Sequence, residues 1–414
     1  MNKYNTVFCS ADILLPAFSS DPERMRKWSV IACDQFTSEP SYWEECRREI
    51  GDAPSTIRYI MPEAYLGTPD EAAHAETVRK AMESFDPRNM RQIDGFVCVE
   101  RTLPDGSVRR GIVGAVDLEG YDYGEGSSSP VRATEGTVLE RIPPRQKIRA
   151  EAKAEFPHVL VLADDRVGLF DAIRRMTGAL LYDFDLMRGG GHIRGYAVTG
   201  FEADCLSRKI AEYERSMDGL VYAVGDGNHS LAAAKAHWET VKRETGASEH
   251  PARYALCELT PIGDDSLRFE PIYRIVRGCD TKELLSELDK ISSPNAAGEP
   301  FTVVTTHGKE ERRFEPSPED SAVTLTVGIV QRFIDRYLAA HPGTSCDYIH
   351  GENALRALSA EPDTVGFLFG GMDKEDLFPY VKRYGKLPRK TFSMGEAESK
   401  RYYLEARSIV SPGE

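Results

Sequence analysis

The sequence lacks the elements that mark redox, zinc-binding and membrane proteins. Its eight cysteines include no CxxC pair, since the closest two are Cys33 and Cys46, and no Cys/His cluster has the spacing of metal ligands. No apolar run approaches the roughly 18 residues that a membrane span needs, and the N-terminus lacks the apolar core of a signal peptide. Together these absences predict reduced thiols and a cytoplasmic location.

Negative charge exceeds positive charge. The 52 lysines and arginines are outnumbered by 66 acidic residues, which gives a formal net charge of -14. Because nucleic-acid-binding domains usually carry a basic face, this balance argues against a nucleic-acid partner. A phosphorylated ligand would have to be met by cations gathered locally.

Two common phosphate-binding motifs are missing as well. The glycine-rich turn at residues 188–191 has neither the GxGxxG spacing of a dinucleotide-binding fold nor the lysine of a P-loop. The composition, 41% hydrophobic and 29% charged over 414 residues, is that of a folded globular protein with room for two or three domains.

The most informative stretch that is present runs over residues 225–230, Gly-Asp-Gly-Asn-His-Ser. The apolar run at residues 220–224 predicts a strand before it, and apolar residues at helical spacing predict a helix after it that ends near Gly246. The first turn of a helix leaves backbone N–H groups unbonded and attracts anions. The same residue types are also common as ordinary helix caps, so both interpretations stay open.

The rest of the chain alternates short strands and helices and predicts an α+β fold with a central mixed sheet and surrounding helices. Residues 95–103 and 108–118 flank a turn and predict a β-hairpin. Ser- and Gly-containing residues 292–300 predict a linker. We expect a body over residues 1–290 that carries the turn, and a C-terminal α+β region over residues 291–414 that packs over it. In that region we expect strands around Phe301 and Phe314 and a helix over residues 326–340.

Six segments together resemble one family. They are residues 132–135, 140–145, 157–160 with Asp164-Asp165, 225–230, 347–351 and 387–395. The family is the domain of unknown function 1015, and the likeness covers nearly the whole chain. This resemblance assigns no activity.

A second resemblance concerns the turn alone. Residues 226–230 are similar to the Asp-Gly-His-His-Arg turn of the free serine kinases, in the ParB and sulfiredoxin superfamily, where the turn holds nucleotide phosphates. Here Asn228 replaces the first histidine and Ser230 replaces the arginine. Because arginine is the side chain best suited to bidentate phosphate contacts, this turn needs cations from elsewhere in order to bind phosphate.

Two locally basic segments could supply these cations. Residues 131–153 contain six basic and three acidic residues, and residues 382–401 contain seven basic and two acidic residues. We select Arg132, Arg145, Arg389 and Lys390 as candidate phosphate ligands. The alternative is that both segments form solvated faces with surface ion pairs worth at most about 1 kcal/mol each.

Three further acidic residues are candidates. Glu135, close to Arg132, suits a general base or a metal ligand, or forms an ordinary salt bridge. Asp164 and Asp165, at the end of a predicted strand, suit Mg²⁺ binding or helix capping. His350 also ends a predicted strand, where a lone histidine is more often structural.

The resulting prediction is a phosphotransferase that acts on serine or a similar small metabolite with ATP or ADP and Mg²⁺. Gly225, Gly227, Asn228 and Ser230 would form the phosphate-binding turn, Asp226 would bind metal or activate a hydroxyl, and His229 would help the arginines stabilise transferred charge. Two alternatives are a nucleotide-dependent regulatory binding module, and a Mg²⁺-assisted phosphatase that uses Asp164, Asp165 and Asp226.

Overall fold

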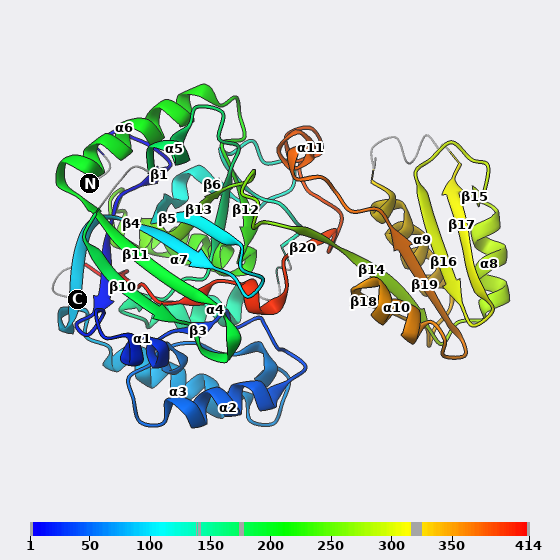
Figure 1. Ribbon diagram of the computed structural model, residues 1–414, viewed down its shortest axis with the longest axis horizontal. Coiled ribbons are helices and arrows are strands. Elements are labelled where there is room, and N and C mark those ends of the chain that lie inside the picture. The colour runs from blue at the N-terminus through cyan, green and yellow to red at the C-terminus, as the bar shows by residue number, and fades with distance from the viewer. Residues whose placement is uncertain (1–2, 138, 140–141, 174–177, 316–324, 412–414) are drawn as a thin grey trace. The chain divides into compact units, whose positions relative to one another are not determined.

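The computed structural model describes residues 3–137, 139, 142–173, 178–315 and 325–411. The chain forms two compact units (Figure 1). The first comprises Met1–Leu267 and Glu396–Glu414, and the second comprises Arg268–Gly395. The boundaries between the units thus lie at 267/268 and 395/396, rather than at the expected 290/291, and the end of the chain returns to the first unit.

The first unit is built on a mixed sheet of eleven strands, in the order β10-β11-β4-β5-β13-β9-β12-β7-β6, with β1 on β5 and β2 on β4. The strands are β1 (Phe8–Cys9), β2 (Ala11–Pro16), β4 (Met90–Thr102), β5 (Val108–Asp117), β6 (Tyr121–Asp122), β7 (Val131–Ala133), β9 (Leu160–Ala163), β10 (Leu180–Asp185), β11 (His192–Thr199), β12 (Tyr222–Asp226) and β13 (Tyr254–Pro261). β4 and β5 form the predicted hairpin. The central mixed sheet expected from the sequence is confirmed.

Helices cover both faces of this sheet (Figure 1). They are α1 (Pro22–Trp28), α2 (Pro40–Ile50), α3 (Glu71–Ser84), α4 (Ile142–Ala150), α5 (Leu169–Ile173), α6 (Gly200–Ser216) and α7 (Asn228–Thr245). Because successive strand residues point to opposite faces, Val97 and Val99 of β4 join a core with α1, α2 and α3. Phe96 and Cys98 join another core with α5, α6 and α7.

The C-terminal segment is tied to the first unit by two small sheets. β21 (Tyr402–Tyr403) pairs with β3 (Val30–Ile31), and β22 (Arg407–Ser408) pairs with β8 (Ala154–Glu155). These pairings explain why the last residues of the chain belong to the first unit although the second unit separates them in sequence.

The second unit has its own sheet of seven strands, in the order β15-β17-β16-β19-β14-β18 with β20 on β14. Its elements are β14 (Phe269–Arg277), α8 (Thr281–Asp289), β15 (Ser292–Ser293), β16 (Pro300–Thr305), β17 (Gly308–Phe314), α9 (Thr326–Ala340), β18 (Ser345–His350), α10 (Glu352–Leu358), β19 (Thr364–Phe369), α11 (Leu377–Tyr384) and β20 (Phe392–Met394). The expected strand pair and the helix over residues 326–340 are confirmed. The expected linker lies inside this unit, at β15 and the start of β16.

The pairing of β12 decides which strand ends lie together in the first unit. β12 is parallel to β7, with Val224 opposite Ala133. It is antiparallel to β9, with Asp226 opposite Leu160 and Tyr222 opposite Ala163. The C-terminal ends of β12 and β7 therefore share one edge of the sheet, and the C-terminal end of β9 lies at the opposite edge.

Candidate functional site

The predicted turn joins β12 to α7. β12 ends at Asp226, α7 begins at Asn228, and Gly227 between them has φ +78°. A Cβ atom at Gly227 would lie 3.0 Å from the Cα of Val159. Glycine is therefore required for two reasons: the backbone is left-handed, and it lies close to Val159, the residue before β9. α7 ends at Thr245, and Gly246, with φ +69°, caps it where the sequence predicts the end of the helix.

The start of α7 has no side-chain cap. Gly227 occupies the cap position and has no side chain that could accept a hydrogen bond from the first turn of the helix. The Leu231 N–H donates the first bond of the helix to the Gly227 carbonyl at 3.0 Å, so the amides of residues 228–230 precede the intrahelical ladder. The Asp226 Oδ1 accepts the adjacent Gly227 N–H at 2.9 Å. The glycine in the cap position leaves the start of the helix suited to an anion.

A lysine from the end of the chain lies at this turn. The Lys400 Nζ lies 3.4 Å from the Asp226 Oδ2, and the two side chains are 11% and 20% exposed. Buried Arg101 and Arg109 position the segment before Lys400 by donating to the carbonyls of Glu398 (2.6 Å) and Ser399 (3.1 Å). The basic segment at residues 382–401 thus brings a cation to the turn through Lys400, which had not been selected as a ligand.

Two more polar side chains belong to this neighbourhood and were missed from the sequence. Burial would raise the pKa of Asp34, but His158, Gln35 and Lys400 outweigh it and hold the pKa below its usual value. The Tyr403 hydroxyl lies 2.7 Å from the His158 Nδ1. Two signals could have found them: Asp34 directly follows the apolar run at residues 30–33, and His158 lies in one of the family-like segments.

A cavity of about 350 Å³ adjoins the first turn of α7. We call it the turn cavity. Its polar lining residues are Cys33, Tyr59, Glu63, Glu71, Arg145, Arg149, Glu155, His158, Ser230 and Tyr403. Arg145 forms an ion pair with Glu63, and Arg149 pairs with Glu155 at 2.7 Å. Apolar side chains, among them Phe156 and Leu231, complete the wall. The volume is in the range of small-molecule sites.

Arg145 and Ser230, both selected from the sequence, therefore line one cavity. His229 is half-buried in the first turn of α7, next to Ser230. Glu135 is half-buried just beyond β7, and the register that pairs Val224 with Ala133 brings it level with Asp226. These candidates gather at one edge of the sheet.

Arg132 is held by contacts within the sheet and its neighbouring loop. It is buried on β7 opposite Ala223, and its Nε donates to the Ser129 carbonyl at 2.8 Å. Burial lowers the pKa of the Arg132 guanidinium. Glu140 and Arg141, from another family-like segment, lie outside the described residues.

Asp164 and Asp165 lie at the other edge of the sheet, because β9 runs antiparallel to β12. Asp165 accepts the N–H groups of Leu169 (2.8 Å) and Phe170 (2.9 Å) at the start of α5. Asp164 accepts a hydrogen bond from Arg166 at 2.7 Å. The structure therefore does not bring these aspartates to Asp226, which corrects the expectation of a shared metal site. The described residues contain no group of three or more His, Cys, Asp and Glu side chains that could hold a metal.

Arg389 and Lys390 belong to the second unit. Their charged groups lie 5.0 and 5.1 Å from the centre of the Tyr348 ring, over which Arg274 also lies at 4.6 Å. His350 is the last residue of β18 and is exposed. That Arg389 and Lys390 reach the turn, and that the second unit packs over it, stay predictions.

The fold and the site define an α+β protein in which an uncapped strand-to-helix turn adjoins a small-molecule cavity. The chain belongs to the family described as protein of unknown function DUF1015, whose model matches residues 15–348. The family-like segment at residues 387–395 lies beyond the matched range. We find no match among curated proteins. Within the described residues, no helix has the length and apolar character required to cross a membrane.

Three solved structures resemble the chain weakly. A free serine kinase variant in complex with AMP is 13% identical, with a TM-score of 0.38, over 72% of this chain and 91% of that one. Another variant of free serine kinase, in complex with ADP, is 14% identical, with a TM-score of 0.38, over 74% and 95% of the two chains. C-terminally truncated SbnI from Staphylococcus aureus is 12% identical, with a TM-score of 0.36, over 72% and 83%.

Proposed function

We propose that residues 226–230 and Lys400 bind the phosphates of ATP or ADP, and that the protein transfers a phosphoryl group to serine or a similar small metabolite in the turn cavity. One observation carries the proposal: an uncapped helix start, with a partly buried lysine beside it, adjoins a cavity of about 350 Å³. This is the arrangement expected of a site for an anionic small molecule.

Phosphate binding would rest on the backbone and on Lys400. The amides of residues 228–230 and the helix dipole favour negative charge at this point. Lys400 supplies the positive charge that the arginine supplies in the similar turn of the free serine kinases. Because a lysine ammonium is a compact point charge rather than a planar fork, the amides would provide the directional contacts. In this proposal the turn binds phosphate in the manner of the ParB- and sulfiredoxin-like turns.

The turn cavity suits an amino acid. A zwitterionic metabolite such as serine presents a carboxylate and an ammonium group, and the cavity is lined by the ion pair of Arg145 and Glu63. Arg145 would receive the carboxylate and Glu63 the ammonium, so that the substrate replaces one ion pair by two. This pairing supports serine or a close relative over a neutral alcohol.

Phosphoryl transfer then requires a base at the edge of the sheet. The substrate hydroxyl oxygen forms a bond to the terminal phosphorus, the bond from that phosphorus to the ADP oxygen breaks, and the hydroxyl proton passes to a carboxylate. Asp226 is the base we propose, with Glu135 as the second carboxylate at the same edge. His229 would stabilise the transferred charge.

Mg²⁺ would enter with the nucleotide. The described residues form no metal site of their own, but a Mg²⁺ ion on nucleotide phosphates needs only one or two protein carboxylates. Glu135 is suited to that contact, because Asp226 faces Lys400. When bound, the ion would neutralise charge on the phosphates.

Thermal unfolding with a ligand panel tests the proposal. The panel contains ATP, ADP, CTP, serine and phosphoserine, each with and without Mg²⁺. ATP or ADP should raise the Tm of the wild-type protein, because a ligand at 100 times its Kd adds about 2.7 kcal/mol to the free energy of unfolding. Lys400→Met should lose most of this shift. Lys242→Met is the control, because Lys242 lies in the last turn of α7 and pairs with Glu119. This variant should keep the Tm shift.

Product formation separates the proposal from its alternatives. A regulatory binding module would bind nucleotide without making phosphoserine, and a phosphatase would release phosphate from phosphoserine without added nucleotide. The absence of any nucleotide-dependent Tm shift would reject both the kinase and the binding module.

A further inference from the structure

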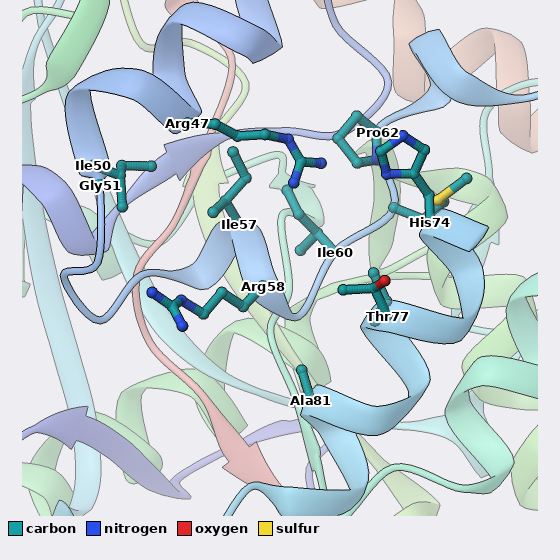
Figure 2. Close-up of a pocket in the computed structure, with 12 residues that line it drawn as sticks. Arg47, Ile50, Gly51, Ile57, Arg58, Ile60, Pro62, His74, Thr77 and Ala81 are labelled. Carbon is teal, nitrogen blue, oxygen red and sulfur yellow. The ribbon is translucent and has the colours of Figure 1, made fainter. Parts of the chain in front are cut away.

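A second cavity of about 350 Å³ lies in the first unit between α2, α3 and the segment that joins them (Figure 2). We call it the α2–α3 cavity. Much of its wall is apolar and comes from all three parts: Ile50 of α2, Ile57 and Ile60 of the joining segment, and Val78 and Ala81 of α3. An apolar cavity of this size is suited to a small organic molecule.

Its ionisable lining is entirely basic. Arg47, Arg58 and His74 line the cavity, and no Asp or Glu is among its described lining residues. This bias stands out in a chain with 66 acidic and 52 basic residues. Figure 2 shows Arg47 and His74 entering the same end of the cavity from α2 and α3. The positive charge of Arg47 disfavours the protonated form of His74 in the same apolar space.

The hydrogen-bonding of the two arginines differs. Arg58 donates to the carbonyls of Asp52 (3.1 Å) and Ala53 (3.2 Å), so it is held at the rim. The Arg47 guanidinium lies 5.5 Å from the centre of the Tyr65 ring, and its Nε is buried without a hydrogen-bond partner among the described residues. A buried donor without a partner is costly, and a carboxylate in the cavity would give the guanidinium a partner.

His74 is placed to share the anion. Its ring stacks on Tyr65 with the centroids 4.0 Å apart. Burial and the neighbouring Arg47 lower its pKa, against the opposite influence of Asp70. An anion bound between Arg47 and His74 would balance the charge of Arg47 and favour the protonated form of His74, which could then share the anion.

We propose that the α2–α3 cavity binds a small organic acid whose carboxylate contacts Arg47 and His74 and whose apolar body fills the space between Ile57, Val78 and Ala81. The chemistry of the wall selects this class of ligand. Inorganic anions would leave the apolar wall unfilled, and a neutral molecule would leave Arg47 without its counter-charge. The site is separate from the turn at residues 226–230 and does not depend on the function proposed there.

Isothermal titration calorimetry with defined probes tests this site. Hexanoate and benzoate should bind the intact protein, whereas hexanol, benzyl alcohol and inorganic phosphate should bind at least tenfold more weakly. Arg47→Gln should reduce the affinity for both acids at least tenfold. Arg48→Gln, at the next and exposed position of α2, should leave it unchanged.

A second variant guards against a folding defect. Ala81→Met leaves Arg47 in place but fills the cavity from α3, and it should abolish binding while the circular dichroism spectrum stays that of the wild-type protein. Equal binding of hexanol and hexanoate, or unchanged hexanoate binding by folded Arg47→Gln or Ala81→Met, would overturn the proposal. Lys400→Met should still bind hexanoate, so a failure of the nucleotide site and a failure of this site are distinguishable.

Discussion

Two strands in the first unit lead into a helix through a segment that contains an aspartate and a left-handed glycine. β9 is followed by Asp164, Asp165 and Gly168 before α5, and β12 ends at Asp226 and continues through Gly227 into α7. The carboxylates behave differently. Asp165 accepts two backbone N–H groups of α5, whereas Asp226 bonds to the adjacent amide with one oxygen and faces Lys400 with the other.

The difference comes from spacing. Asp165 stands four residues before Leu169, far enough for its carboxylate to fold back onto the amides that begin α5. Asp226 immediately precedes the cap position, which is filled by a residue without a side chain. A side chain that caps a helix satisfies the amides that a ligand would otherwise use. The turn before α7 is therefore the one suited to a ligand, and the turn before α5 is structural.

The sharpest way to break this comparison is to neutralise each aspartate in turn. Asp226→Asn should lower the rate of phosphoserine formation from serine and ATP by at least about a hundredfold, because it removes the proposed base. Asp165→Asn should leave that rate within about twofold, since its carboxylate lies at the opposite edge of the sheet. A coupled assay for ADP measures both.

The folded state needs a separate check in this pair. The Tm of Asp226→Asn should stay close to the wild-type value, because the asparagine oxygen can still accept the Gly227 N–H. If Asp226→Asn keeps wild-type turnover, Asp226 is not the base. An equal loss in Asp165→Asn would remove the distinction between the two turns.

The two glycines offer a second matched pair. Alanine in the left-handed region costs roughly 1–2 kcal/mol at either position. At Gly227 the new Cβ would also lie 3.0 Å from the Val159 backbone, whereas at Gly168 its nearest neighbour would be the Asp171 carboxylate at 3.7 Å. In urea denaturation, Gly227→Ala should lose about 3 kcal/mol of unfolding free energy. Gly168→Ala should lose only the roughly 1–2 kcal/mol that comes from the left-handed backbone. Equal losses would mean that the contact with Val159 is easily relieved.

The helices also differ in what they bury. Among the described residues of α5 the buried ones are all apolar, but α7 buries His237. Burial, then the charges of Arg149 and His250, lower the pKa of His237 to about 4. The unfolded state therefore binds a proton between about pH 6.5 and pH 4 that the folded state does not bind, so stability falls as the pH falls through this window.

This linkage is measurable by urea denaturation at two pH values. The share of His237 in the loss of unfolding free energy between pH 7 and pH 5 should be about 2 kcal/mol. His237→Gln should reduce the pH dependence by that amount. His250 is half-buried and lies outside α7, and His250→Gln should reduce the pH dependence less. An unchanged slope in His237→Gln would mean that His237 does not titrate in this way.

Local patterns in the sequence were sufficient for the elements of the site. The apolar run before Gly225 and the helical spacing after it predicted β12 and α7, and turn residues predicted the β4–β5 hairpin. These features depend on residues that are close in sequence. The resemblance in residues 226–230 pointed to the same turn.

The arrangement of these elements could not be read in the same way. The antiparallel pairing of β9 and β12 sends Asp165 away from Asp226, and pairing between distant strands leaves no local signal. Lys400 reaches Asp226 because Tyr402 and Tyr403 pair with β3 near the other end of the chain. The sequence shows that the segment around Lys400 is basic, but which of its cations lies at the turn depends on the pairing of β21 with β3.

The smallest expected effect concerns the cap itself. Asp165→Ala removes the acceptor of two α5 amides and should lower the free energy of unfolding by about 1 kcal/mol. Asn228→Ala, in the first turn of α7, should lower it less, because no hydrogen bond is assigned to its buried Oδ1 among the described residues. If Asn228→Ala instead weakens ATP binding without loss of stability, the two turns differ as proposed. Asp165 then stabilises its helix, and Asn228 contacts the ligand. A stability loss equal to that of Asp165→Ala would make α7 a capped helix like α5.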